Sequence, residues 1–100
     1  MTACKALTRE MLSKPIDVRS PSGTVDFQTA RRLAEEKARE RLAEPMLLAW
    51  YDREAGTYSP KVECCDEHKP GWLVYAESRG GDVTVSVDRE AYVFVFRSGP

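Results

Sequence analysis

The C-terminal third of the chain alternates between apolar and polar positions with a period of two. Three runs carry the pattern: Trp72, Val74 and Ala76; Val83, Val85 and Val87; and Tyr92, Phe94 and Phe96. Such a period is typical of strands in a sheet that has a buried face. The pattern therefore predicts strands at 72–78, 82–87 and 91–97.

A helical period replaces this alternation between residues 27 and 43. The apolar residues there recur at intervals of three and four, with charged residues between them: Phe27, Ala30, Leu33, Ala34, Ala38 and Leu42. This spacing predicts one long amphipathic helix over 27–43. Three of its apolar positions are alanine, so the helix can lie close against a sheet. Thr24 or Asp26 can cap its start, and Pro45 cannot continue it.

Shorter segments complete the expected set of elements. Residues 46–52 and 57–64 predict a hairpin. Pro60 lacks an N–H group, so the second strand lies at an edge or position 60 lies on the side that has no neighbouring strand. The segment 3–13 predicts a short N-terminal helix, and 16–19 predicts an extended stretch.

Two turns are predicted between the C-terminal strands. Gly80 and Gly81 lie between two predicted strands, so they indicate a hairpin turn. A phosphate-binding loop would need a helix after the glycines. Residues 88–90 predict the next short turn.

Together these elements predict an α+β fold in a single domain over 1–100. We expect an antiparallel meander of about five strands, at 46–52, 57–64, 72–78, 82–87 and 91–97, covered by one long helix. A short N-terminal helix precedes it. Two architectures fit this order. One resembles the cystatin-like arrangement, in which a curved sheet wraps a helix, and the other is an unrelated two-layer sandwich.

The balance of acidic and basic side chains indicates which classes of binding partner suit the protein. The 100 residues include 15 basic and 16 acidic side chains, for a net charge of −1. This balance argues against nucleic-acid binding as the main task. The first 14 residues carry charges that a signal peptide lacks, and no apolar stretch approaches the roughly 20 residues of a membrane span. We therefore expect a cytoplasmic protein that does not insert into a membrane, and its three cysteines fit reduced thiols.

One cluster of metal-binding residue types occurs, at Cys64, Cys65 and His68. Thiolate and imidazole suit zinc or a similar metal. Adjacent cysteines on an extended backbone point in opposite directions, however, whereas paired zinc ligands have two to four residues between them. The cluster is therefore read as a buried cysteine followed by a polar loop. A thiol or metal site, serving a redox sensor or a small enzyme, is the alternative.

Catalytic and cofactor motifs are missing from the sequence. His68 is the sole histidine, and the chain has no zinc-protease helix motif, no glycine-rich phosphate loop and no nucleophile elbow. No residue is assigned a catalytic role and no cofactor is expected. The sequence therefore favours a protein that is not an enzyme.

The best functional clue comes from the alternate positions of the predicted strands, which point to the second face of the sheet. These positions are apolar as well: Leu73, Tyr75, Val93 and Val95. Three alternatives remain for what packs against that face: the N-terminal segment 3–19, a protein partner or second subunit, or stacked bases. We expect a small interaction or accessory domain that self-associates, as in a homodimer, or binds a protein through its sheet.

Three segments carry a family resemblance: 60–65 (Pro-Lys-Val-Glu-Cys-Cys), 69–82 (Lys-Pro-Gly-Trp-Leu-Val-Tyr-Ala-Glu-Ser-Arg-Gly-Gly-Asp) and 92–96 (Tyr-Val-Phe-Val-Phe). Over about residues 27–97 the chain resembles a small family of uncharacterised prokaryotic α+β proteins. The resemblance implies a compact domain of unknown function and carries over no catalytic residue.

Overall fold

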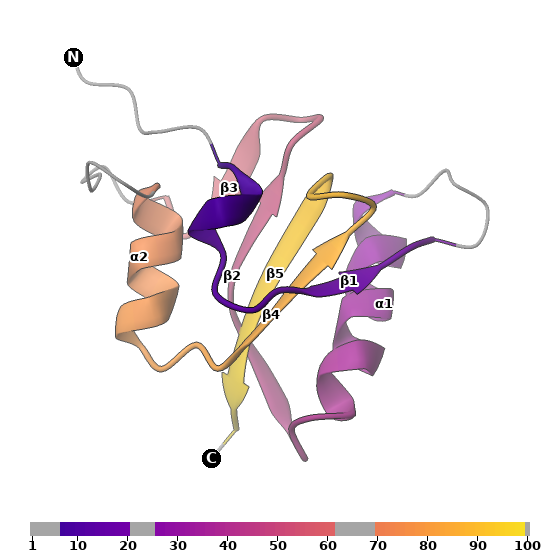
Figure 1. Cartoon of the computed structure of the whole chain (residues 1–100), viewed down its shortest axis with the longest axis vertical. Helices are drawn as coiled ribbons and strands as arrows, with labels where there is room; N and C mark the ends of the chain where they lie inside the picture. Colours follow the sequence, from indigo (N-terminus) through magenta and orange to yellow (C-terminus); the bar gives the residue numbers. More distant parts are fainter. Residues whose placement is uncertain (1–6, 21–25, 62–69, 100) are drawn as a thin grey trace.

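The computed structural model describes residues 7–20, 26–61 and 70–99. They form one mixed β-sheet with an α-helix on either side (Figure 1). The elements in chain order are a 3-10 turn η1 (Arg9–Met11), β1 (Ile16–Val18), α1 (Phe27–Arg39), β2 (Pro45–Asp52), β3 (Thr57–Ser59), α2 (Gly71–Ser78), β4 (Val83–Val87) and β5 (Tyr92–Ser98).

The five strands lie in the order β1-β4-β5-β2-β3. The three pairs β4–β5, β5–β2 and β2–β3 are antiparallel, and a bulge interrupts β2 between Leu47 and Ala49. β1 pairs with β4 in parallel, with Ile16 opposite Val85. The expectation of a purely antiparallel sheet is therefore wrong at this edge, and the expectation of a meander is wrong as well, because β2 pairs with β5 and β3 does not pair with β4. A strand so far from its partner in the sequence needs no hairpin, so it can enter the sheet in the parallel direction.

The predicted strand 72–78 is also wrong, because residues 71–78 form α2. Trp72, Leu73 and Ala76 are its buried non-glycine residues, and they share one side of the helix, whereas Val74 is 36% exposed. A short run that is apolar almost throughout fits either period, so the sequence pattern alone could not decide between them. The glycines after α2 accordingly lie in a helix-to-strand connection and not in a hairpin, and Gly80 has a φ of 86° there.

Most other elements confirm the sequence pattern. α1, β2, β4 and β5 lie within a few residues of their predicted bounds, and β1 occupies the predicted extended stretch. The carboxylate of Asp26 caps α1 by accepting a hydrogen bond of 2.8 Å from the Thr29 amide. Of the predicted strand 57–64, β3 accounts for the first three residues, and 62–64 lie outside the described ranges. The predicted helix over 3–13 is represented by η1 alone among the described residues.

α1 covers one face of the sheet through its alanines. Ala30, Ala34 and Ala38 are each 0% exposed. They pack against the inward side chains of the two central strands: Val83, Val85, Val87, Tyr92, Phe94 and Phe96. Phe27, in the first turn of α1, meets the Trp50 ring edge-on with 4.7 Å between centroids. The predicted packing of an alanine-lined helix on this face is confirmed.

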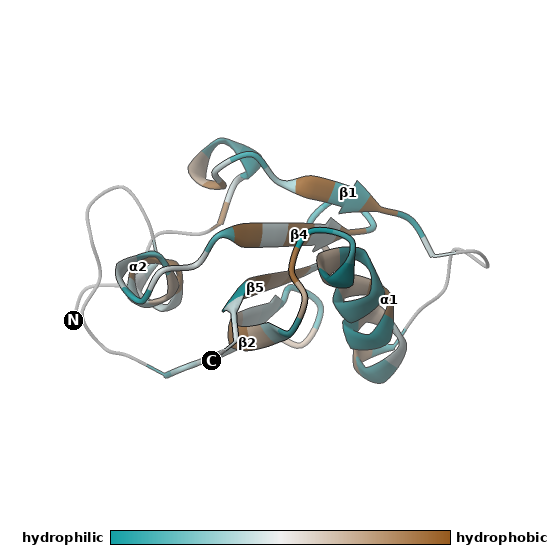
Figure 2. Ribbon diagram, turned by 90° about the horizontal axis from the view of Figure 1, so that it is seen from below, coloured by the Kyte–Doolittle hydropathy of each residue, from teal (hydrophilic) through white to brown (hydrophobic). Residues whose placement is uncertain are grey.

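The opposite face is covered by α2 and by the segment before β1. Leu7 and Leu12 join Trp72 in a second buried cluster over Val93 and Val95. Figure 2 shows the sheet from below with α1 and α2 on its two sides. A helix on each face departs from both architectures expected from the sequence, which place the helical cover on one face. Both faces of the sheet are therefore occupied by this chain itself.

Candidate functional site

Cys64, Cys65 and His68 lie in the segment 62–69, outside the described residues. Within the described part of the chain, no group of three or more histidine, cysteine, aspartate or glutamate side chains is placed to hold a metal ion. The candidate sites of the described part of the chain therefore consist of other residues.

The four residues predicted to line an interface have unequal access to the surface. Leu73, Val93 and Val95 are at most 1% exposed and belong to the cluster beneath α2. They stabilise the interior and offer no surface to a partner. Tyr75 is partly exposed on α2, and the Arg79 guanidinium lies 4.9 Å from its ring centroid. Of the alternatives for this face, cover by the chain's own N-terminal segment accounts for Leu7 and Leu12.

With both faces covered, the edges of the sheet remain as its accessible parts. At the β1 edge the Arg9 guanidinium binds the Asp17 carboxylate with two hydrogen bonds, of 2.6 and 2.8 Å. These bonds lower the pKa of Asp17 below its ordinary value of 3.8. The same bonds, with a further one to Glu90, raise the pKa of Arg9 above its ordinary value. A charged side chain in the middle of a three-residue edge strand discourages pairing with another strand.

The opposite edge is only partly closed. β3 pairs with Trp50, Tyr51 and Asp52, so the first five residues of β2 have no strand beyond them among the described elements. We call Pro45–Ala49 the open segment of β2. Met46 in this segment is 40% exposed and Ala49 is buried. The open segment combines a free strand edge with an exposed apolar side chain, which are the components of a strand-pairing site.

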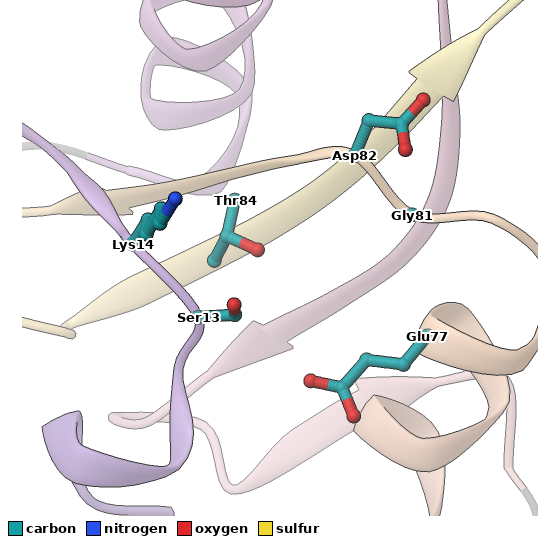
Figure 3. Close-up of a pocket in the computed structure, with 6 residues that line it drawn as sticks. All are labelled: Ser13, Lys14, Glu77, Gly81, Asp82 and Thr84. Atoms are coloured by element: carbon teal, nitrogen blue, oxygen red, sulfur yellow. The ribbon is translucent and has the colours of Figure 1, made fainter.

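A second candidate site is a cavity of about 300 Å³ on the α2 side of the sheet (Figure 3). We call it the polar pocket, and its lining residues are Ser13, Lys14, Glu77, Gly81, Asp82 and Thr84. They come from the segment before β1, the end of α2, the connection after it and the start of β4.

The local structure explains why the pocket is polar. Val93 and Val95 of β5 meet α2, whereas the same face of β4 carries Thr84 and Ser86. Ser86 is fully buried, and its hydroxyl donates to the Glu90 carboxylate at 2.7 Å. Thr84 instead lines the pocket. The polar side of β4 thus lies between α2 and residues 7–14, the two segments that cover this face of the sheet.

Sequence reasoning assigned no role to the pocket residues. The available signal was the strand 83–87, in which valine alternates with Thr84 and Ser86. That alternation is typical of a strand with one wet face, yet all five residues of β4 are buried. Buried hydroxyls on a covered face could have marked the site, but only once α2 was known to be a helix.

Comparison with known proteins places the chain among relatives. Residues 13–96 match the family described as domain of unknown function DUF5619. The chain belongs to this family. It is 36% identical over 70 residues to an uncharacterized protein of Archaeoglobus fulgidus, a match that covers 70% of this chain and 74% of the relative. The predicted resemblance to an uncharacterised prokaryotic family is confirmed.

A solved structure shares the fold of this DUF5619 chain. It is the crystal structure of a protein named AF1514 from the same archaeon, with a TM-score of 0.72 and 30% sequence identity. The similarity covers 89% of this chain and 98% of that one. The descriptions of these relatives name no catalytic or redox activity. Neither described α-helix is long and apolar enough to cross a membrane.

Proposed function

We propose that this protein is a small non-catalytic interaction domain that self-associates through the open segment of β2. One observation carries the proposal: Pro45–Ala49 extend past β3 along the sheet edge, and Met46 is 40% exposed there. An unpaired edge offers backbone donors and acceptors to an added strand. The faces of the sheet do not serve this purpose, since α1, α2 and residues 7–12 cover them.

A second copy of the chain is the partner that fits this edge. All five residues of the open segment are uncharged, Pro-Met-Leu-Leu-Ala at 45–49. Antiparallel pairing about a two-fold axis would therefore bring apolar side chains together without opposing like charges. Pro45 lacks an N–H group, and the bulge between Leu47 and Ala49 interrupts the ladder. Pairing is thus confined to a short stretch, and we expect a reversible dimer.

Sedimentation velocity over a wide range of protein concentration tests the proposal. We expect the dimer fraction of the unmodified chain to rise with concentration. Met46→Lys places a charge at the centre of the contact and should leave a monomer. Val74→Lys is the matched control, because Val74 is the other large apolar side chain with high exposure among the described residues, at 36%, and lies on α2.

Three results would overturn the proposal. The first is a strict monomer at high micromolar concentration. The second is a dimer that Val74→Lys abolishes and Met46→Lys leaves intact, which would assign the contact to α2. The third is a dimer that disappears with reductant, since the three cysteines could link two chains covalently.

A further inference from the structure

We infer that the polar pocket binds a small zwitterion, a molecule with one ammonium and one carboxylate group such as a free α-amino acid. The pocket uses none of the residues of the open segment of β2. The inference is therefore independent of self-association.

Thr84 provides the first argument. It is 7% exposed, and its hydroxyl has no hydrogen-bond partner among the described residues. Every fully buried side-chain oxygen or nitrogen among the described residues has a partner, as Ser86 does two residues further along the same strand, so the Thr84 oxygen is one that the pocket leaves accessible. Figure 3 shows the Thr84 oxygen directed toward the space between Ser13 and Glu77. The hydroxyl is therefore available to a ligand atom in the pocket.

The side of the pocket formed by the segment before β1 suits a carboxylate. Lys14 and Ser13 come from that segment, and Lys14 forms no ion pair with any residue in the described ranges. In Figure 3 their side chains lie on the same side as Thr84. An ammonium group with two hydroxyls can donate three hydrogen bonds to one carboxylate.

The other side of the pocket suits an ammonium group. Glu77 reaches into this region from the last turn of α2, and Asp82 follows in the connection to β4 (Figure 3). The C-terminal end of a helix carries partial negative charge, which adds to that of the carboxylates. The Glu77 carboxylate on this side also disfavours a phosphate dianion.

The size of the pocket agrees with this class of ligand. A cavity of about 300 Å³ is at the lower end of the range for small-molecule sites. A cavity of this volume accommodates a free amino acid. An amino acid carries both kinds of charge, as the lining of the pocket does.

Heteronuclear NMR titration tests the inference, with each of the common free amino acids as probe. We expect at least one to shift the backbone amides of residues 81–84 saturably at submillimolar concentration. Its carboxamide and its N-acetyl derivative each lack one charge. Each should bind about tenfold more weakly or worse, because charge-assisted hydrogen bonds are the stronger class.

Two variants locate the site. Thr84→Val preserves the shape of the side chain and removes the hydroxyl, and Lys14→Met removes the ammonium. Each should weaken binding by about three- to tenfold, the range for the loss of one hydrogen bond. Lys37→Met on α1 is the control and should bind as the unmodified chain does, because α1 covers the opposite face of the sheet. Thermal melts of all variants verify folding.

The titration is repeated in Met46→Lys, so that binding and self-association are judged separately. Absence of shifts with every amino acid at tens of millimolar would overturn the inference. Equally tight binding of inorganic phosphate would also overturn it, because it would indicate a simple anion site. Unchanged affinity in both Thr84→Val and Lys14→Met would place the ligand elsewhere.

Discussion

Gly81 packs so closely against Val95 that no side chain fits between them. A Cβ atom at Gly81 would lie 2.7 Å from Val95 Cγ1 and 3.0 Å from the carbonyl oxygen of Ala76. The Gly81 amide also donates a hydrogen bond of 3.0 Å to that carbonyl. This contact fixes the C-terminal end of α2 against β5, and with it one wall of the polar pocket.

Gly81→Ala should therefore destabilise the fold by about 1–3 kcal/mol, the usual cost of forcing an extra methyl group into a packed region. Urea denaturation of the variant measures the loss. In the double variant with Val95→Ala, the added methyl gains room from the shortened side chain. We expect the combined loss to be smaller than the sum of the two single losses. A Gly81→Ala protein as stable as the unmodified chain would contradict the observed packing.

The alanines of α1 support a second prediction of the same kind. Ala34 is 0% exposed at the centre of the contact between α1 and the sheet. Ala34→Leu adds three heavy atoms where no space exists, so we expect a loss of about 1–3 kcal/mol in the free energy of unfolding. Glu36→Leu is a control at an exposed position of the same helix and should change stability little. Equal effects of the two variants would contradict the position of α1.

The sequence predicted the elements whose period is long or repeated. α1 has thirteen residues with three buried alanines at spacings of four, so its period was unambiguous. β4 and β5 alternate beside a short turn, and they pair as predicted. α2 has eight residues and buries neighbours such as Trp72 and Leu73 together, so neither period was decisive. Its misreading as a strand also produced the predicted hairpin at Gly80.

The candidate sites were less predictable because each depends on contacts between distant segments. The parallel pairing of β1 with β4 joins residues nearly seventy positions apart, such as Ile16 and Val85, and no local pattern encodes it. That pairing brings Lys14 to the same cavity as Thr84. The open segment of β2 likewise follows from the shortness of β3, which the sequence did not predict.

Stability should decrease in acid through Asp17. The hydrogen bonds from Arg9 lower the pKa of this carboxyl below its ordinary value of 3.8. A carboxyl whose folded pKa is below its unfolded value stabilises the fold above the unfolded value, and this contribution is lost as the pH falls through the folded value. We expect the melting temperature to fall with decreasing pH below about pH 4.

Asp17→Asn tests this dependence, because an amide keeps the shape of the side chain and does not titrate in this range. The variant should have a lower melting temperature at neutral pH and a shallower decrease in acid. Asp26 contributes a remaining slope, since the hydrogen bond from the Thr29 amide lowers its pKa as well. Parallel melting curves for Asp17→Asn and the unmodified chain at every pH would refute a contribution from the Arg9–Asp17 pair.

The turn between β4 and β5 provides the last prediction. Asp88, Arg89 and Glu90 all have left-handed backbone conformations, with φ values of 52°, 59° and 64°. The Asp88 carboxylate accepts hydrogen bonds from the Ser20 amide and hydroxyl, at 2.8 and 2.9 Å. The Glu90 carboxylate accepts one from Ser86. Arg89 is exposed, and its side chain makes no hydrogen bond to a described residue.

Of these three turn residues, only Arg89 therefore bears the cost of a left-handed backbone without a compensating contact from its side chain. Arg89→Gly removes that cost, and even after the extra entropy of glycine in the unfolded chain we expect a gain of about 0.5–1 kcal/mol. Asp88→Gly and Glu90→Gly should destabilise the protein, because each removes the carboxylate that accepts a hydrogen bond from the hydroxyl of a serine at least nine-tenths buried, Ser20 and Ser86 respectively. Urea denaturation of the three variants separates these effects, and a loss of stability in Arg89→Gly would show that backbone strain does not limit this turn.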